Sequence, residues 1–261
     1  MSVPLYADLD GRSAVVTGAG GGVGYEIAGA LATAGALVWI NDLDADRASE
    51  AAEAITSNGG DGPGGARPVV ADVTDADAIA AMAETTGPVD IVVNNAGLPL
   101  RRFDLKRFAE TEPQSWHEWI EINLFGVMQV THTYLSDMLE QEWGRVVTIV
   151  SDAGRVGERG QVVYGAAKAG AMGFTRGLAM EVGRHGVTAN CIALGSIRHG
   201  VISEAYDANP EIEAKILRNY PVGRLGTPAD PAPLAVLLCS EAGSWITGQV
   251  YPVNGGYSSS L

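Results

Sequence analysis

The sequence predicts an α/β protein in which seven parallel strands form a doubly wound sheet with helices on both faces. Strand-like and helix-like segments alternate along all 261 residues, and 46% of the residues are hydrophobic. A chain of this length and composition buries a substantial core, and alternating elements favour a parallel sheet. A glycine-rich segment follows the first strand-like segment, which places a ligand at the carboxyl ends of the strands. One domain covering residues 1–261 is the simplest organisation.

Apolar segments that end in turn residues predict the strands, and Ala-rich segments with a helical apolar period predict the helices. The predicted strands span residues 12–17, 36–41, 67–71, 89–93, 145–150, 187–193 and 248–253. Helices are predicted over residues 23–33, 112–138, 161–184 and 228–240, and another is predicted to start near Asp44. Because parallel strands need crossover connections, the helices are expected to cover both faces of the sheet.

The first strand runs directly into a glycine-rich loop, Gly18-Ala-Gly-Gly-Gly22-Val-Gly24. Glycines permit a tight turn and let a pyrophosphate approach the backbone, and the following helix presents its N–H groups to phosphate charge. An ordinary strand-to-helix turn is the alternative for such a loop taken alone. The acid at the end of the next strand favours the phosphate-binding interpretation.

That acid is Asp42, which lies 18 residues beyond Gly24. Ribose hydroxyls of a bound dinucleotide are expected at this place, and Asp42 can accept hydrogen bonds from both. The 2′-phosphate of NADP carries a charge of about −1.5 to −2 and would be repelled there. No Lys or Arg occurs from position 13 to position 46 to offset this repulsion, so the pattern favours NAD. The alternative is that Asp42 only caps the helix that starts near Asp44.

Ser151, Tyr164 and Lys168 bring a hydroxyl, a phenol and an ammonium into one short segment. Positions 164 and 168 share one face of the predicted helix. A phenol with a pKa near 10 exchanges protons poorly at neutral pH unless a cation stabilises the phenolate. At roughly 4 Å and an effective dielectric of about 20, one ammonium contributes about 4 kcal/mol. The spacing therefore predicts that Lys168 lowers the pKa of Tyr164, and a surface helix with an amphipathic tyrosine is the alternative.

These motifs resemble the short-chain dehydrogenase/reductase family over essentially the whole chain. The family motif T-G-x-x-x-G-x-G is matched by the segment from Thr17 to Gly24, and N-N-A-G is matched by Asn94 to Gly97. The catalytic residues of the family fall on Asn123, Ser151, Tyr164 and Lys168. The resemblance implies a Rossmann-type fold. It also implies an enzyme that interconverts a secondary alcohol and a ketone.

The resemblance also implies which residues hold the cofactor and what each catalytic residue does. The expected cofactor residues are Thr17, Gly18, Gly22, Val23, Gly24, Asp42, Asp72, Val73, Asn95, Ala96, Gly97, Tyr164, Lys168, Gly195 and Ile197. Among them, the Asp72-Val73 pair resembles the pair that contacts the adenine ring. Tyr164 is expected to exchange the hydroxyl proton, and Lys168 to hold the nicotinamide ribose. Ser151 is expected to orient the carbonyl oxygen, and Asn123 to support a water path.

Two positions depart from the family pattern. The family segment P-G-x-x-x-T reads here from Leu194 to His199, so that the proline and the threonine are both missing. Either His199 or Ser196 is expected to replace the threonine, or the nicotinamide is held less firmly, and a solvated loop histidine is the alternative for His199. Asn254 stands where many members have aspartate, and it is expected to be structural. In this family the segment over residues 196–227 folds over the substrate as a lid.

Charge and cysteine usage exclude several classes of function. The net charge of −14 argues against nucleic-acid binding and gives no support for docking on anionic membranes. The chain has no leader-like segment and no apolar span near 20 residues, and Cys191 and Cys239 are expected to be reduced core residues. We therefore expect a cytoplasmic protein. No cluster of Cys, His, Asp or Glu predicts a metal.

The sequence thus predicts an NAD(H)-dependent oxidoreductase that acts on a small-molecule alcohol or ketone. A 3-oxoacyl thioester reductase using NADPH, on acyl carrier protein or CoA, is one alternative, and a non-catalytic dinucleotide sensor or scaffold is another. Arg101, Arg102, Lys106 and Arg107 would attract an anionic substrate or form a solvated basic face. The family also implies a homo-oligomer, a tetramer or a dimer. Substrate identity and physiological direction are not specified.

Overall fold

The sheet has seven strands, all parallel, in the order β3-β2-β1-β4-β5-β6-β7. The computed structural model describes residues 8–58, 64–97, 106–200, 203, 207 and 209–259. The strands are β1 (Ser13–Thr17), β2 (Leu37–Asp42), β3 (Gly65–Val70), β4 (Ile91–Asn94), β5 (Gly144–Ser151), β6 (Val187–Leu194) and β7 (Val250–Val253). The predicted fold class is confirmed, and each strand boundary lies within two residues of its predicted position.

The strand order reverses at β1, which pairs with β2 on one side and with β4 on the other. Val16 of β1 lies opposite Ile40 of β2 and Val93 of β4. Connections from the two sides of such a reversal leave in opposite directions, so a crevice opens at the carboxyl ends of these strands. Thr17, Asp42 and Asn94, which end the three strands, therefore lie at the edge of one crevice.

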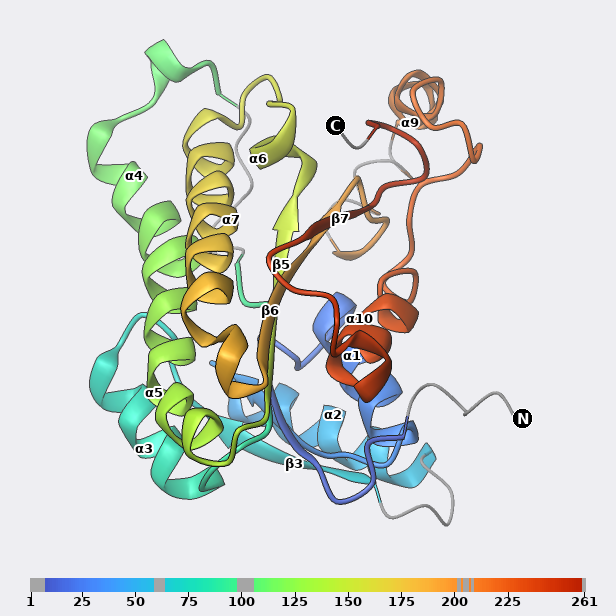
Figure 1. Cartoon of the computed structure of the whole chain (residues 1–261). Helices are drawn as coiled ribbons and strands as arrows, with labels where there is room; N and C mark the ends of the chain where they lie inside the picture. The colour runs from blue at the N-terminus through green and yellow to red at the C-terminus, as the bar shows by residue number, and fades with distance from the viewer. Residues whose placement is uncertain are drawn as a thin grey trace.

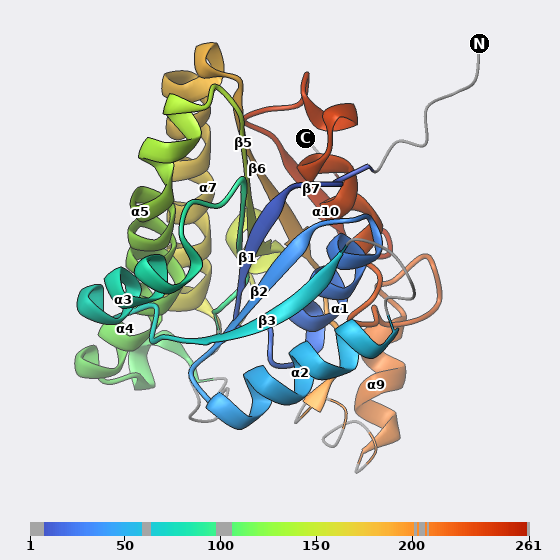
Figure 2. The ribbon, with the colours of Figure 1, turned by 90° about the horizontal axis from the view of Figure 1, so that it is seen from below.

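Two helical layers cover the sheet, and β1 shows how one strand contacts both (Figures 1 and 2). One layer contains α1 (Gly22–Thr33), α2 (Ala45–Asn58) and α10 (Ala232–Cys239), and the other contains α3 (Ala76–Thr86), α5 (Gly126–Glu140) and α7 (Val162–Val182). Ala14 and Val16 belong to the core under the first layer, and Val15 belongs to the core under the second. Successive strand residues point to opposite faces, so a strand buried on both sides is apolar throughout.

The segment predicted as one helix over residues 112–138 is interrupted. It consists of α4 (Pro113–Ile120), a π-helical turn η2 (Glu121–Phe125) and then α5. The hydrophobic pattern continues through the turn, which is why the sequence did not reveal it. At Gly126, just after the turn, a Cβ atom would lie 2.9 Å from the Val73 carbonyl oxygen. The interruption is significant because π turns inside helices often occur at functional sites.

The remaining elements are short, and two of them, η3 and η4, lie on the amino-terminal side of the sheet because they precede β6 and β7. They are η1 (Phe108–Glu110), α6 (Asp152–Arg155), η3 (Gly183–His185), α9 (Pro210–Leu217) and η4 (Glu241–Gly243). α10 begins at Ala232 and not at the predicted residue 228. The Asp230 carboxylate accepts a hydrogen bond from the Thr227 N–H at 2.6 Å and pairs with Arg224 at 2.7 Å, which fixes a turn before the helix.

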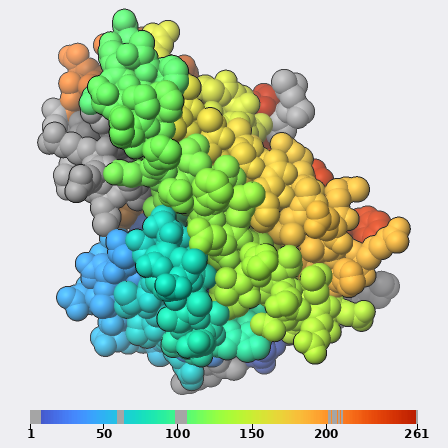
Figure 3. All heavy atoms as spheres, turned by 90° about the vertical axis from the view of Figure 1, so that its left-hand side faces the viewer, coloured from blue at the N-terminus to red at the C-terminus, as the bar shows by residue number. Residues whose placement is uncertain are grey.

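None of the helices in the described ranges is long and apolar enough to cross a membrane. Cys191 and Cys239 are both buried and unpaired with each other. The outer surface of the second layer is the face drawn in Figure 3, where α3, α4, α5 and α7 lie side by side. The lid predicted over residues 196–227 is described only in part, and its role stays a prediction.

Candidate active site

The glycine-rich loop between β1 and α1 is shaped by the absence of side chains. Gly18 and Gly22 have φ angles of 61° and 59°, which L-residues with a side chain rarely adopt. At Gly24 a Cβ atom would lie 2.5 Å from the Asn95 amide nitrogen and 2.6 Å from the Gly18 carbonyl oxygen. The helix has no side-chain cap and no acidic residue in its first turn. Its first N–H groups can therefore bind an anion.

Hydrogen bonds between the ends of β1 and β4 hold this loop in place. The Thr17 hydroxyl accepts from the backbone N–H groups of Asn95 at 3.0 Å and Ala96 at 3.1 Å. The Asn95 amide in turn donates to the carbonyl oxygens of Thr17 at 2.9 Å and Gly18 at 3.0 Å. The structure thus brings four of the predicted cofactor residues together. Their visible contacts brace the loop, and Val23 packs against the core.

Asp42 is a buried carboxylate, 6% exposed, held against the same loop. One of its oxygens accepts from the Gly20 N–H at 3.0 Å, and the other accepts from the Asp44 N–H at 3.1 Å. The cap of α2 is Asp44, whose carboxylate accepts from the N–H groups of Asp46 and Arg47. The alternative in which Asp42 merely caps α2 is therefore wrong.

A cation lies beside Asp42, contrary to the expectation that none would be near. The guanidinium of Arg47 is 3.6 Å from the Asp42 carboxylate, and its side chain is 48% exposed. A Cβ atom at Gly21 would be 3.5 Å from the same guanidinium. The sequence window ended at position 46, one residue too early. Extending it through the first turn of α2 would have found this residue.

The other residues predicted to hold the cofactor occupy loops at the same edge of the sheet. Asp72 follows β3 and accepts hydrogen bonds from the Thr74 N–H at 2.8 Å and hydroxyl at 2.7 Å. Val73 is buried. Gly195 follows β6, where a Cβ atom would lie 3.1 Å from the Asn254 Cα atom. Ile197 forms a parallel bridge with Gly226. The glycine-rich loop over residues 18–24, hereafter the glycine cradle, and the buried carboxylate of Asp42 together fit a dinucleotide.

The residues predicted to react come from neighbouring segments, and two of them, Asn123 and Lys168, meet at Gly97. Ser151 ends β5, Tyr164 and Lys168 lie in the first turns of α7, and Asn123 lies in the π turn η2. A Cβ atom at Gly97 would be 2.7 Å from the Asn123 Oδ1 atom and 2.8 Å from the Lys168 Nζ atom. Residues from three separate segments therefore share one site at the carboxyl edge of the sheet.

Burial dominates the electrostatics of this site. It raises the pKa of Tyr164 to about 12, although a hydrogen bond with Ser151 acts in the opposite direction, and the Glu158 carboxylate raises it further. Burial also lowers the pKa of Lys168, which is 3% exposed, to about 8. The Lys168 ammonium donates to the Ile149 carbonyl at 2.8 Å and lies 5.8 Å from the centre of the Tyr164 ring. The net pKa of Tyr164 is thus raised and not lowered as expected, because burial of the phenol is the largest influence on it. The contribution of Lys168 stays a prediction.

Asn123 offers an unpaired acceptor next to the lysine. Its side-chain nitrogen donates to the Trp119 carbonyl oxygen at 3.0 Å. Its Oδ1 atom is buried and has no hydrogen-bond partner within the described residues. Buried polar atoms are nearly always satisfied, so an orphan acceptor of this kind is a candidate functional group.

The two departures from the family pattern occupy different surroundings. A Cβ atom at Gly22 would lie 2.9 Å from the His199 Nε2 atom, so the histidine lies against the glycine loop although it is exposed. The Ser196 backbone N–H donates to the Tyr220 hydroxyl at 2.8 Å. Asn254 donates to the Asp152 carboxylate at 2.6 Å, which is the structural role expected of it. Of the two replacements considered for the threonine, His199 is the one seen to touch the loop.

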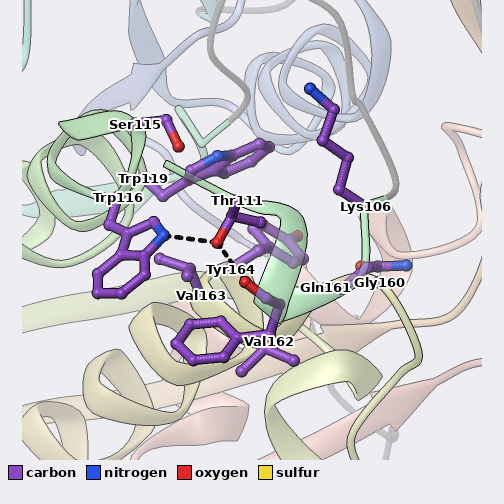
Figure 4. A pocket seen from close by; sticks show the side chains of 11 residues that line it. Lys106, Thr111, Ser115, Trp116, Trp119, Gly160, Gln161, Val162, Val163 and Tyr164 are labelled. Carbon is purple, nitrogen blue, oxygen red and sulfur yellow. Dashed lines mark hydrogen bonds between the residues drawn. The ribbon is translucent and has the colours of Figure 1, made fainter. Parts of the chain in front are cut away.

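A cavity opens beside Tyr164, between α4 and the start of α7 (Figure 4). Its empty space, counted together with the open solvent at its mouth, is about 440 Å³. Its lining includes Phe108, Trp116, Trp119, Gln161, Val162 and Val163. Sequence reasoning overlooked these residues, although Trp119 lies one helical turn before Asn123 and so shares its face.

Two further sequence predictions concern the basic cluster and metal binding. Arg101 and Arg102 of the basic cluster lie outside the described residues, whereas Lys106 and Arg107 are exposed. Across the part of the chain that the structure describes, no group of His, Cys, Asp and Glu side chains is suited to holding a metal ion.

The fold, the glycine cradle and the reacting cluster define an α/β oxidoreductase that binds a dinucleotide. Residues 18–258 match the family model described as enoyl-(acyl carrier protein) reductase. The chain is 37% identical over 252 residues to 3-oxoacyl-[acyl-carrier-protein] reductase FabG of Aquifex aeolicus (strain VF5), covering 95% of this chain and 98% of that protein. The chain belongs to the short-chain dehydrogenase/reductase family, whose members bind nicotinamide dinucleotides.

Solved structures of relatives contain both forms of the cofactor. A 3-oxoacyl-[acyl-carrier protein] reductase from Brucella melitensis with bound NAD is 33% identical, with a TM-score of 0.86 and coverage of 96% of this chain and 92% of that one. A gluconate 5-dehydrogenase from Burkholderia cenocepacia J2315, in complex with NADP and tartrate, is 30% identical, with a TM-score of 0.86 and coverage of 97% and 98%. Family membership therefore leaves both the cofactor form and the substrate to be argued from this chain.

Proposed function

We propose that this protein is an NAD(H)-dependent oxidoreductase that interconverts a secondary alcohol and a ketone, with Tyr164 as the acid/base. The proposal rests chiefly on the arrangement of four residues at the sheet edge that carries the glycine-rich loop: Asn123 and Lys168 meet at Gly97, Lys168 lies 5.8 Å from the Tyr164 ring, and Tyr164 is hydrogen-bonded with Ser151. The nicotinamide dinucleotide, when bound, supplies the hydride acceptor or donor. The residues of the chain orient the substrate and transfer the proton.

In the oxidative direction, the Tyr164 phenolate takes the proton from the substrate hydroxyl. The Ser151 hydroxyl accepts a hydrogen bond from the Ala153 N–H at 3.2 Å and is hydrogen-bonded with Tyr164, so it stands beside the phenol where a substrate oxygen would bind. It then orients the substrate oxygen and stabilises the negative charge that develops there. In the reductive direction the same phenol returns the proton to the carbonyl oxygen.

Lys168 and Asn123 support the proton transfer without touching the reacting carbon. With a pKa of about 8, Lys168 is mostly protonated at neutral pH, and its charge favours the phenolate once Tyr164 ionises. The unpartnered Oδ1 atom of Asn123 lies near the Lys168 ammonium, where it can accept a hydrogen bond from a group that carries a proton. The pair offers a route by which Tyr164 regains or releases its proton.

Asp42 is the main support for NAD over NADP. The carboxylate is buried and oriented by the N–H groups of Gly20 and Asp44, so it can accept from ribose hydroxyls with little rearrangement. A 2′-phosphate would place a second negative group against it. Arg47 reduces this preference, because its guanidinium is near enough to pair with such a phosphate.

A reductase for 3-oxoacyl thioesters with NADPH is the second candidate. The similarity to the Aquifex aeolicus reductase and the position of Arg47 both favour it. The buried Asp42 weighs against NADPH. A non-catalytic sensor or scaffold has less support, since all four reacting residues are present and close together.

The proposal extends to assembly, location and substrate access. We expect a cytoplasmic homodimer or homotetramer that binds neither nucleic acid nor membranes, formed through the α5 and α7 surfaces that Figure 3 shows. Three exposed apolar residues lie on or next to these helices: Phe125 at the end of η2, Met128 of α5 and Met180 of α7. Residues 196–227 are proposed to act as the lid of a single domain. Light scattering tests the assembly, and a monomer at micromolar concentration would contradict it.

The function is tested by following NADH formation with NAD⁺ and a panel of secondary alcohols, diols, hydroxyacyl thioesters and hydroxysteroids. The expected result is turnover with at least one class of alcohol, faster with NAD⁺ than with NADP⁺, and lost in Tyr164→Phe. Full turnover in that variant would overturn the assignment of Tyr164. Tight NADH binding without turnover of any substrate would favour the sensor.

A further inference from the structure

The cavity beside Tyr164 has aromatic walls whose positions are fixed. The rings of Phe108 and Trp116 are stacked, with centroids 5.0 Å apart and planes inclined by 23°. The Trp116 indole N–H donates to the Thr111 hydroxyl at 2.9 Å, which holds the indole in one orientation (Figure 4). Aromatic residues held in this way form preorganised surfaces for another ring.

Trp119 connects these walls to the reacting group. Its ring meets the Tyr164 ring edge to face, with centroids 5.5 Å apart and planes inclined by 71°. Val162 and Val163 precede Tyr164 at the start of α7 and line the same cavity. A group attached to the reacting carbon would therefore enter apolar and aromatic surroundings directly from the Tyr164 phenol.

Charges of both signs lie near the phenol, because the Lys168 ammonium is 5.8 Å from the centre of the Tyr164 ring and Lys106 lines the cavity. The Glu158 carboxylate acts on Tyr164, and burial and the nearby Asp152 raise the pKa of Glu158 itself. Gln161, which lines the cavity, donates to Glu158 at 2.7 Å. Thr111 and Ser115 also line the cavity, so polar groups stand beside its aromatic rings, and the rings are its distinctive feature.

We propose that the substrate is a secondary alcohol, or the matching ketone, whose reacting carbon carries a flat ring that packs against Trp119 and Trp116. This inference rests on the proposed function and names the substrate class of the same site. Ring-to-ring packing adds to the burial of apolar area, so a ring is preferred to a flexible chain of equal carbon number. Hydride leaves the reacting carbon for the nicotinamide, the hydroxyl proton goes to Tyr164, and the ketone remains.

The test compares racemic 1-phenylethanol with racemic 2-octanol, two alcohols of equal carbon number, in NAD⁺ reduction by the full-length protein. We expect kcat/KM for 1-phenylethanol to exceed that for 2-octanol by about tenfold. Mannitol and 3-hydroxybutyryl-CoA serve as the polyol and the anionic thioester, and both are expected to be poorer substrates than 1-phenylethanol, because neither carries a ring on its reacting carbon. Equal values for the ring and the chain, or a preference for either polar compound, would overturn the inference.

Variants assign the preference to Trp119. In Trp119→Leu the ratio between the two alcohols is expected to fall to within about twofold of unity, and in Trp119→Phe about half of the preference, on a logarithmic scale, is expected to remain. Trp245→Leu is the matched control, because Trp245 is 97% exposed, and it should leave the ratio unchanged. A ratio that survives in Trp119→Leu would show that another wall sets the preference and would overturn the role of Trp119.

A binding measurement separates this inference from the proposed chemistry. Acetophenone is titrated into the NADH-loaded Tyr164→Phe variant, which should bind but not react, and into the same variant carrying Trp119→Leu. We expect about tenfold weaker binding in the double variant. Unchanged binding would overturn the substrate class while leaving the acid/base role of Tyr164 intact. Turnover in Tyr164→Phe would instead contradict the proposed function.

Discussion

The glycine loop with Asp42 and the cluster around Gly97 are two halves of one crevice, and they are built in different ways. The loop depends on backbone N–H groups and on space that a Cβ atom would fill, as at Gly24. The cluster depends on side chains that hold or move a proton, above all Tyr164 and Lys168. Substitutions that add a side chain to the loop should therefore impair NADH binding, and substitutions that remove a reacting group should impair turnover. Each kind of substitution should have little effect on the other property.

The largest effect is expected from Tyr164→Phe. Removing the hydroxyl eliminates the proposed acid/base group, which lowers kcat by about a thousandfold. Affinity for NADH should stay within about twofold of the wild-type value, because the substitution alters neither the glycine loop nor Asp42. Steady-state kinetics and NADH titration measure the two quantities on one preparation.

Tyr134→Phe is the matched control for that variant. Tyr134 is fully buried, and its hydroxyl is 3.0 Å from the Thr86 hydroxyl, outside the crevice. Its loss is expected to lower the free energy of unfolding by about 1 kcal/mol and to leave kcat unchanged. An equal loss of turnover in both variants would indicate that any buried tyrosine hydroxyl matters, and the proposed division would not hold.

Gly24→Ala should weaken NADH binding by about a hundredfold, since the new methyl would overlap the Asn95 amide and the Gly18 carbonyl and displace the loop. Gly173→Ala is the control, because a Cβ atom there meets nothing within 4 Å and the residue lies inside α7. It is expected to raise the free energy of unfolding by about 0.5–1 kcal/mol. Unimpaired NADH binding in Gly24→Ala would remove the steric argument for the cradle.

The pH dependence of alcohol oxidation should report the burial of Tyr164. Burial raises its pKa to about 12, so the phenolate fraction grows about tenfold per pH unit through the neutral range. We expect kcat/KM for oxidation to rise from pH 6 to pH 8 and the slope to fall above about pH 8, where Lys168 loses its proton. Ketone reduction uses the protonated phenol and should change little below pH 8. A flat oxidative profile would mean that another group takes the proton.

Asp42→Asn tests the choice of cofactor with a smaller effect. The substitution removes the negative charge of the side chain and keeps its shape, so the ratio of NADH affinity to NADPH affinity is expected to fall about thirtyfold. Both affinities can be titrated by the change in nicotinamide fluorescence. If the wild-type protein already binds NADPH as tightly as NADH, Asp42 is not the discriminating group.

Arg47→Leu should have the smallest effect and the opposite sign. The side chain is half exposed, so its pairing with a 2′-phosphate is screened and contributes only about 0.7 kcal/mol. The preference for NADH over NADPH is expected to rise about threefold. An unchanged preference would indicate that the guanidinium serves Asp42 alone.

Several features were predictable from sequence because local pattern determines them. The strands follow from short apolar segments such as that ending at Thr17, and the cradle follows from glycines whose function needs no side chain. Other features depend on contacts between distant segments. The placement of His199 on Gly22 and the ring contact of Trp119 with Tyr164 are of this kind. The direction of the Tyr164 pKa shift was misjudged because burial is a property of the folded chain, whereas the Lys168 spacing is local.

The most direct test of the division between the two halves is an NADH titration of Tyr164→Phe and Gly24→Ala, read together with their residual turnover. The account predicts that Tyr164→Phe binds NADH within about twofold of wild type while its turnover falls about a thousandfold. It predicts that Gly24→Ala loses affinity but regains most of its turnover at saturating NAD⁺. NADH binding lost in Tyr164→Phe, or turnover lost in Gly24→Ala at full saturation, would contradict it.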